Sequence, residues 1–233
     1  MTEEFDAVLL DLGGTLVEMT PSVEEVFAKT LERHGRADIG KDAIAEAVRR
    51  AELTFDEDFA RMDENTEKEV WDRYDDFVFD MVGFNGDREA ARREMAEEFR
   101  RIVPEPKNWV AYPDTRPFLE ALSKRDFKKG ILSNATDLAR KVMDNLDLSR
   151  YFDFVIISDE VKVRKPSPEI FLMAARKAKT APGRMLYFGD KLAVDVKGAQ
   201  SVGMPAILVD RKNVYSDAGV FKVRNLDYAR RFL

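Results

Sequence analysis

The chain has 233 residues, of which 45% are hydrophobic and 35% charged, and its formal net charge is -6. It contains no cysteine and one histidine, which excludes thiol nucleophiles, disulfides and thiolate metal sites and argues against histidine-based catalysis. The acidic balance argues against nucleic acid as a partner. No run approaches the ~20 apolar residues that cross a bilayer, and the acidic start MTEEFD is unlike a secretory signal. We therefore expect a cytoplasmic protein without a membrane partner.

In the N-terminal part of the chain, a strand-like apolar run is followed by a long segment with helical spacing of its apolar residues. A short apolar run, Ala7–Leu10, predicts a buried strand that ends in the sequence DLGGT. Between Pro21 and Val103 there is no strand-like run, and apolar residues recur three and four positions apart. This spacing is typical of amphipathic helices, for example over Val23–Arg33 and over Val70–Met81. We expect about four antiparallel helices that form a small bundle.

From Trp109 onward, short apolar runs alternate with helical patterns. The predicted strands are Gly130–Leu132, Phe154–Ile157, Met185–Phe188 and Ala206–Val209. The predicted helices are Arg116–Ser123, Asp137–Leu146, Pro168–Lys179, Ala193–Val202 and a final one, Leu226–Phe232. Such alternation indicates an α/β domain with a parallel sheet and helices on both of its faces.

The simplest organisation is one α/β domain that is interrupted by the helical segment. We expect the α/β domain to comprise residues 1–17 and 109–233, and the helical domain residues 18–108. The linkers would be Val17–Pro21 and the proline-containing segment Val103–Pro113.

Polar residues follow the predicted strands, where open parallel sheets bind their ligands. They are Asp11, Ser133 with Asn134, Lys165, Gly189 with Asp190, and, five residues further on, Asp195. Each has an ordinary alternative, because an aspartate or serine after a strand often caps a helix and a loop lysine is usually solvated. Their joint placement at successive strand ends favours a functional site.

The amino-acid sequences of these segments resemble the four signature motifs of the haloacid dehalogenase superfamily and occur in the same order along the chain. The motifs are Asp11–Leu16, Ile131–Asn134, Lys165–Phe171, and Gly189–Asp190 with Asp195. The resemblance covers the α/β part nearly end to end, and the helical segment is similar to a type-1 cap. It implies a three-layer, Rossmann-like parallel-sheet core with an inserted helical-bundle cap.

The resemblance also implies a Mg²⁺-dependent hydrolase of small phosphate monoesters. Asp11 would be the nucleophile that forms an aspartyl-phosphate, and Lys165 would neutralise both Asp11 and the transferring phosphoryl group. Mg²⁺, a hard cation that prefers oxygen ligands, would be held by Asp11, Asp190, Asp195 and the backbone carbonyl of Gly13.

The same resemblance implies a phosphate-binding set. Ser133 would donate a hydrogen bond to the phosphoryl group, with Asn134 beside it, and the backbone amides of the turn at Gly14 and Thr15 would complete the cradle around Lys165. The partner would be a compact phosphorylated metabolite, and the protein a monomer or a homodimer.

One position departs from the phosphatases of this superfamily, which usually carry a second aspartate two residues after the nucleophile. Here that residue is Gly13, so the side chain that protonates the leaving group is missing, a role worth roughly 10²–10⁴ in rate. Three alternatives follow: a phosphatase that is slow or uses good leaving groups, a protein that binds phosphate or a partner without turnover, or a dehalogenase. Dehalogenation needs no Mg²⁺, which would leave Asp190 idle. Glu18 is one candidate for the missing acid, and Lys191 is expected to point to solvent.

Overall fold

The computed structural model describes residues 5–216 and 219–230. The chain forms two compact units, of which one runs to Glu18 and resumes at Trp109 and the other is Met19–Asn108. The first crossing between units therefore follows residue 18, where the sequence suggested residue 17. Each unit is described by itself below.

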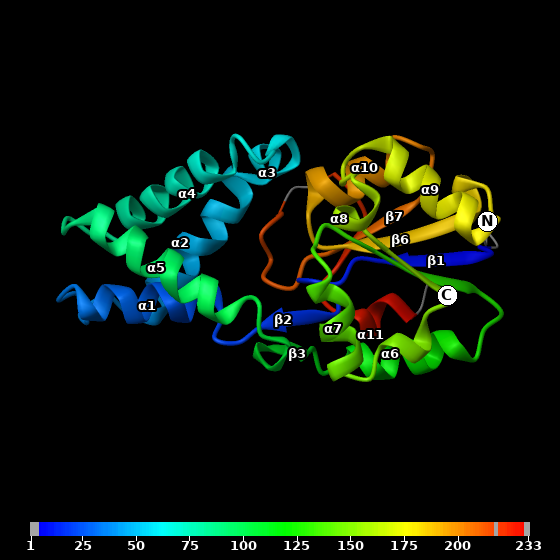
Figure 1. The fold of residues 1–233 in the computed structure, drawn as a ribbon, viewed down its shortest axis with the longest axis horizontal. Coiled ribbons are helices and arrows are strands. Elements are labelled where there is room, and N and C mark those ends of the chain that lie inside the picture. Colours follow the sequence, from blue (N-terminus) through cyan, green and yellow to red (C-terminus); the bar gives the residue numbers. More distant parts are fainter. Residues whose placement is uncertain (1–4, 217–218, 231–233) are drawn as a thin grey trace. The chain divides into compact units, whose positions relative to one another are not determined.

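A six-stranded sheet forms the centre of the first unit, in the order β5-β4-β1-β6-β7-β8. Its strands β1, β6 and β7 are labelled in Figure 1. All of its neighbouring strands pair in parallel, which confirms the parallel sheet expected from the sequence. The strands are β1 (Ala7–Leu10), β4 (Lys128–Ser133), β5 (Phe154–Ile157), β6 (Met185–Gly189), β7 (Ala206–Val209) and β8 (Lys222–Val223).

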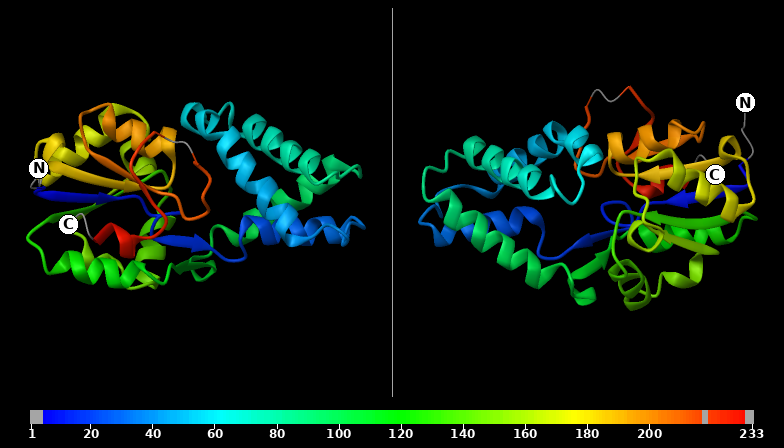
Figure 2. Two further views of the ribbon diagram at one scale, coloured as in Figure 1. Left: turned by 180° about the vertical axis from the view of Figure 1, so that it is seen from behind. Right: turned by 45° about the horizontal axis from the view of Figure 1, so that its top comes forward.

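Helices cover both faces of this sheet, which makes three layers (Figures 1 and 2). Because side chains alternate along a strand, Val8 and Leu10 pack on one face while Ala7 and Leu9 pack on the other. The first face is covered by α6 (Thr115–Ser123), α7 (Leu138–Asn145) and α11 (Leu226–Ala229). The second is covered by α9 (Pro168–Ala178) and α10 (Lys197–Gln200). The three-layer α/β architecture is confirmed.

The structure differs from the sequence-based expectations at three places. Both predicted linkers contain a short strand, β2 (Val17–Met19) and β3 (Trp109–Ala111), and these two strands form a separate sheet. The helix expected over Ala193–Val202 begins as a π-helical segment, η4 (Leu192–Val196), and continues as α10. The last helix ends at Ala229, and the end of the expected Leu226–Phe232 lies outside the described residues. The remaining short elements are α8 (Ser158–Val161), η1 (Pro106–Asn108), η2 (Ser149–Tyr151) and η3 (Pro182–Arg184).

The second unit is helical, as the spacing of its apolar residues predicted. Its helices are α1 (Val23–Arg33), α2 (Lys41–Thr54), α3 (Asp56–Arg61), α4 (Glu67–Met81) and α5 (Arg88–Ile102). A capping box starts α1, because the Ser22 hydroxyl accepts the Glu25 amide and the Glu25 carboxylate accepts the Ser22 amide. Phe79 packs edge-on against Phe27 and in a tilted contact against Phe84, and all three rings are buried.

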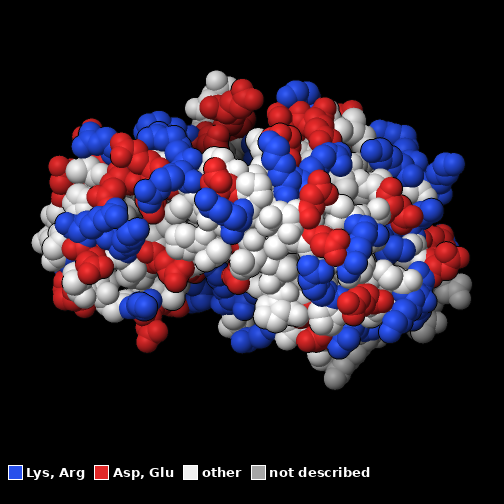
Figure 3. Space-filling view, turned by 60° about the horizontal axis from the view of Figure 1, so that its bottom comes forward, with Lys and Arg blue, Asp and Glu red and all other residues white. Residues whose placement is uncertain are grey.

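The surface carries charge of both signs. Lysines and arginines are interspersed with aspartates and glutamates on the face drawn in Figure 3. Among the described residues, no helix combines the length and the apolar composition needed to span a bilayer.

Candidate active site

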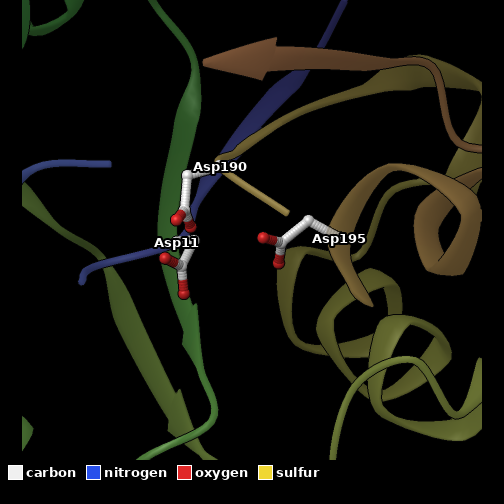
Figure 4. Close-up of side chains that lie close together, drawn as sticks. All are labelled: Asp11, Asp190 and Asp195. Atoms are coloured by element: carbon white, nitrogen blue, oxygen red, sulfur yellow. The ribbon is translucent and has the colours of Figure 1, made fainter. Parts of the chain in front are cut away.

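The register of the sheet gathers the polar residues that follow its central strands. Leu10 pairs with Ile131 of β4 on one side and with Phe188 of β6 on the other. The next residue, Asp11, therefore stands at the same edge as the ends of β4 and β6, and its amide donates to the Phe188 carbonyl at 2.8 Å. Carboxylate oxygens of Asp11, Asp190 and Asp195 lie within 4.8 Å of one another (Figure 4).

A buried lysine neutralises part of this acidic cluster. Lys165 is 2% exposed, and its Nζ donates at 2.7 Å to Asp11 Oδ1 and at 2.7 Å to Asp195 Oδ1. Burial by itself lowers the pKa of Lys165, but the two carboxylates outweigh it and raise the pKa above its ordinary value. Lys165 thus favours its charged form and links the end of the first strand to η4.

Two of the three carboxyl groups, those of Asp11 and Asp190, are less easily ionised than ordinary aspartates. Burial raises the pKa of Asp11 to about 6, with Lys165 opposing that rise and the Asp195 charge adding to it. Burial, followed by repulsion from Asp11 and Asp195, raises the pKa of Asp190 well above its usual value. One ammonium thus balances fewer than all of the negative charges, and the cluster is suited to a further cation.

The residues present fit a hard divalent cation, because their donors are carboxylate oxygens. Gly14 allows the DLGGT turn to approach Asp190: it has a φ of +75°, and a Cβ added there would lie 2.3 Å from Asp190 Oδ2. Asp195 is more committed, since its Oδ1 accepts from Lys165 and its Oδ2 accepts the Lys191 amide at 3.0 Å. Asp11 and Asp190 lie side by side in Figure 4, with the carboxylate of Asp195 pointing toward them.

Two of the expected phosphate ligands have other partners in the structure. The Asn134 side chain donates to the Lys165 carbonyl and accepts the Lys165 amide, both at 2.8 Å, so it positions Lys165. The Gly14 amide donates to the Val17 carbonyl at 2.8 Å. These hydrogen bonds inside the protein use both groups, and their roles toward phosphate stay predictions.

Ser133 and Thr15, the other expected phosphate ligands, also stay predictions. Ser133 ends β4 and is buried. Thr15 is also buried, and its hydroxyl oxygen has no hydrogen-bond partner. A buried hydroxyl without a partner is costly and calls for an explanation such as an absent ligand.

Sequence reasoning missed Tyr187, which lies inside β6. Its hydroxyl lies 2.9 Å from Asp195 Oδ1 and 3.1 Å from Lys165 Nζ. It falls within the predicted strand Met185–Phe188, and the one signal that could have singled it out is that a buried tyrosine hydroxyl needs a polar partner. Lys191 was expected to point to solvent, but it is partly buried, and burial lowers its pKa to about 8.

Gly13 leaves room for a side chain. A Cβ added there would meet only the ring of Trp109, at 3.9 Å, which is an ordinary contact distance. An aspartate side chain at position 13 would therefore not be crowded near its Cβ.

Comparisons with known proteins agree with this geometry. The sequence pattern of haloacid dehalogenase-like hydrolases matches residues 5–203. A phosphoserine phosphatase of Thermus thermophilus is 36% identical over 51% of this chain and 47% of its own length, so the match spans about half of each protein. A phosphoglycolate phosphatase of Aquifex aeolicus is 27% identical over 86% of this chain and 83% of its own. The crystal structure of a HAD phosphatase from Thermococcus onnurineus has a TM-score of 0.58 and 27% identity, over 97% of this chain and 96% of that one.

Proposed function

Because this chain belongs to the haloacid dehalogenase-like hydrolase family, we propose that it is a Mg²⁺-dependent phosphatase of small phosphate monoesters. The names of its relatives support hydrolysis of phosphate esters, since they include phosphoserine and phosphoglycolate phosphatases. The observation that carries the proposal is the Lys165 ammonium held between Asp11 and Asp195, with Asp190 beside Asp11.

Asp11 is the proposed nucleophile. A carboxylate oxygen of Asp11 forms a bond to phosphorus while the bond from phosphorus to the ester oxygen breaks, which gives an aspartyl-phosphate and an alcohol whose oxygen takes its proton from solvent water. Water then attacks that phosphorus and gives up a proton to solvent, the bond to Asp11 breaks, and inorganic phosphate leaves. Two displacements replace one difficult step. Lys165 stays protonated throughout and offsets the charge that gathers near Asp11.

Mg²⁺ would be held by Asp11, Asp190 and the carbonyl of Gly13, with Asp195 assisting through water or directly. When bound, it would offset the repulsion between the carboxylates and the phosphate dianion. Ser133, Asn134, Gly14 and Thr15 are proposed phosphate ligands beside Lys165, and among them Ser133 and Thr15 are buried. The proposed substrate is a compact phosphorylated metabolite.

The test is hydrolysis of p-nitrophenyl phosphate with and without EDTA, in the native chain and in two variants. We expect Mg²⁺-dependent turnover that EDTA abolishes, that Asp11→Asn reduces to background, and that Asp126→Asn leaves unchanged. Asp126 is an exposed aspartate of the same unit and serves as the matched control. Turnover that is independent of metal, or insensitive to Asp11→Asn, would contradict the proposal. Mg²⁺ and phosphate binding without turnover on a broad panel of phosphate esters would favour a non-catalytic binding protein.

A further inference from the structure

Arg211 lies just beyond β7 and contacts the turn that follows Asp11. Its Nε and Nη2 donate to the carbonyl oxygen of Thr15 at 3.2 and 2.7 Å. Thr15 is fully buried, and its own hydroxyl has no partner, so that hydroxyl does not hold the turn in place. Arg211 therefore holds the turn through the Thr15 carbonyl, in addition to the turn's own hydrogen bonds from the Leu16 and Val17 amides to the Leu12 carbonyl.

Arg211 is itself held firmly by its surroundings. Asp114 accepts from Nη1 and Nη2, both at 3.0 Å, and the exposed fractions of the two side chains are 13% and 8%. Asp114 also accepts the amide of Leu226 at 2.7 Å, and the guanidinium carbon lies 3.8 Å from the centre of the Tyr112 ring. A planar fork that meets a carboxylate, a carbonyl and an aromatic ring at once is specific to arginine, because lysine has a single nitrogen.

The next carbonyl of the turn is fixed from the same side. The Thr115 hydroxyl donates to the Leu16 carbonyl at 2.6 Å, and the Tyr112 amide donates to it at 3.1 Å. Two successive carbonyls, those of Thr15 and Leu16, are thus held by Arg211 and by the segment at the start of α6. In the interactions described above, Arg211, Thr115 and Tyr112 contact the turn but do not contact the three aspartates or Lys165.

The position of this turn matters because it packs closely against the metal-binding acids. A Cβ on Gly14 would lie 2.3 Å from Asp190 Oδ2, so the backbone of the turn stands directly beside that carboxylate. A displacement of the turn by a few tenths of an ångström would change how Asp11 and Asp190 face each other. Small errors in the placement of reacting groups are costly, with about 10²-fold losses for 1 Å.

We propose that Arg211, oriented by Asp114, is a positioning residue for the Asp11 centre. It acts through the Thr15 carbonyl and sets the turn that carries Gly13 and Gly14 against Asp190. The expected effect of Arg211 on catalysis rests on the proposed function. Its role in fixing the turn through the Thr15 carbonyl does not depend on that function.

The experiment compares Arg211→Lys with a matched control, Arg140→Lys. Arg140 also makes a two-point contact with a carboxylate, through Nε and Nη2 to Glu160 at 2.7 and 2.8 Å, but on the surface. Two readouts are measured on the full chain: the hydrogen-exchange rate of the Gly14 amide, which reports the turn, and kcat and KM for p-nitrophenyl phosphate with Mg²⁺. Circular dichroism confirms that both variants are folded at the assay temperature. If Arg211→Lys does not fold, Asp114→Asn is measured in its place, because it frees the guanidinium while retaining it.

We expect Arg211→Lys to accelerate exchange at Gly14 and to lower kcat about tenfold or more, with a smaller change in KM, whereas Arg140→Lys changes neither. Unchanged exchange at Gly14 would overturn the inference. Faster exchange with an unchanged kcat would also overturn it, since the ion pair would then be only structural. If the native chain has no turnover but Gly14 exchange still accelerates, the proposed function fails while the hold of Arg211 on the turn stands.

Discussion

At the scale of single residues, Tyr187 links two charged groups of the site through one hydroxyl. Replacement by phenylalanine removes a hydrogen bond to the buried Asp195 and leaves the ring in place. We expect Tyr187→Phe to lower the free energy of unfolding by about 1.5–3 kcal/mol, the usual value for a hydrogen bond to a charged group, and to lower kcat. Urea denaturation and steady-state kinetics measure the two effects.

The control for this variant is Tyr151→Phe. The Tyr151 hydroxyl accepts from Arg150 at 3.0 Å, away from the acidic cluster. We expect Tyr151→Phe to lower the free energy of unfolding by less than Tyr187→Phe does and to leave kcat unchanged. Equal effects of the two substitutions on kcat would show that the Tyr187 hydroxyl has no part in the site.

Gly13 supplies a second prediction at this scale. The space near its Cβ position accepts a side chain, so Gly13→Asp introduces a carboxyl group without a backbone clash. We expect hydrolysis of alkyl phosphates to accelerate about tenfold or more, because a general acid contributes roughly 10²–10⁴ to such reactions. Hydrolysis of p-nitrophenyl phosphate, whose leaving group needs no proton, should change little. Equal acceleration of both substrates would mean that the new carboxyl group does not act by protonating the leaving group.

The sequence predicted the convergence of Asp11, Lys165, Asp190 and Asp195 because residues at the carboxyl ends of parallel strands meet at one edge. It could not predict the partners of Asn134 and Gly14. An amide in a loop bonds to whichever group the loop conformation presents, and that conformation depends on tertiary contacts. Arg211 was missed although it follows β7, and the same rule about strand ends would have drawn attention to it.

At the scale of elements, the apolar runs predicted the strands β5 and β7 to the residue and the long helices closely. The short strands β2 and β3 were missed because three residues carry too little alternation to be recognised. The π-helical segment η4 was predicted as α-helix, since its spacing fits both. Its conformation brings Asp195 so close to β6 that a Cβ on Gly189 would lie 2.5 Å from the Asp195 Cβ.

Helix α4 carries an acid whose ionisation opposes folding. Burial, with help from the charges of Asp72 and Asp76, raises the pKa of Asp75 from 3.8 to about 7. The native state therefore binds this proton more tightly than the unfolded chain does. The resulting stabilisation is complete below about pH 4 and is lost as the pH rises through about 7.

We expect Asp75→Asn to raise the free energy of unfolding of the helical unit at pH 8 by about 1–3 kcal/mol and to do much less at pH 4. Urea denaturation across this pH range measures the difference. Glu69→Gln, at an exposed position of the same helix, is the control and should show no such pH dependence. A gain for Asp75→Asn that is the same at both pH values would contradict the role of ionisation.

At the scale of the whole molecule, the acidic cluster should make stability depend on metal. The clustered carboxylates repel one another, and a ligand that binds only the folded state stabilises it by mass action. We expect Mg²⁺ to raise the melting temperature of the native chain. Asp190→Asn should melt at a higher temperature than the native chain in EDTA and should lose the response to Mg²⁺. A native chain that does not respond to millimolar Mg²⁺ would argue against the metal site.

The most direct test of the account is to trap the phosphorylated nucleophile. The chain is mixed with substrate and Mg²⁺, quenched in acid within the first turnover, digested, and analysed by mass spectrometry. We predict one added phosphoryl group on the peptide that contains Asp11, lost on treatment with hydroxylamine and absent from Asp11→Asn. Turnover without this adduct, or an adduct on another residue, would contradict the assignment of Asp11 as the nucleophile.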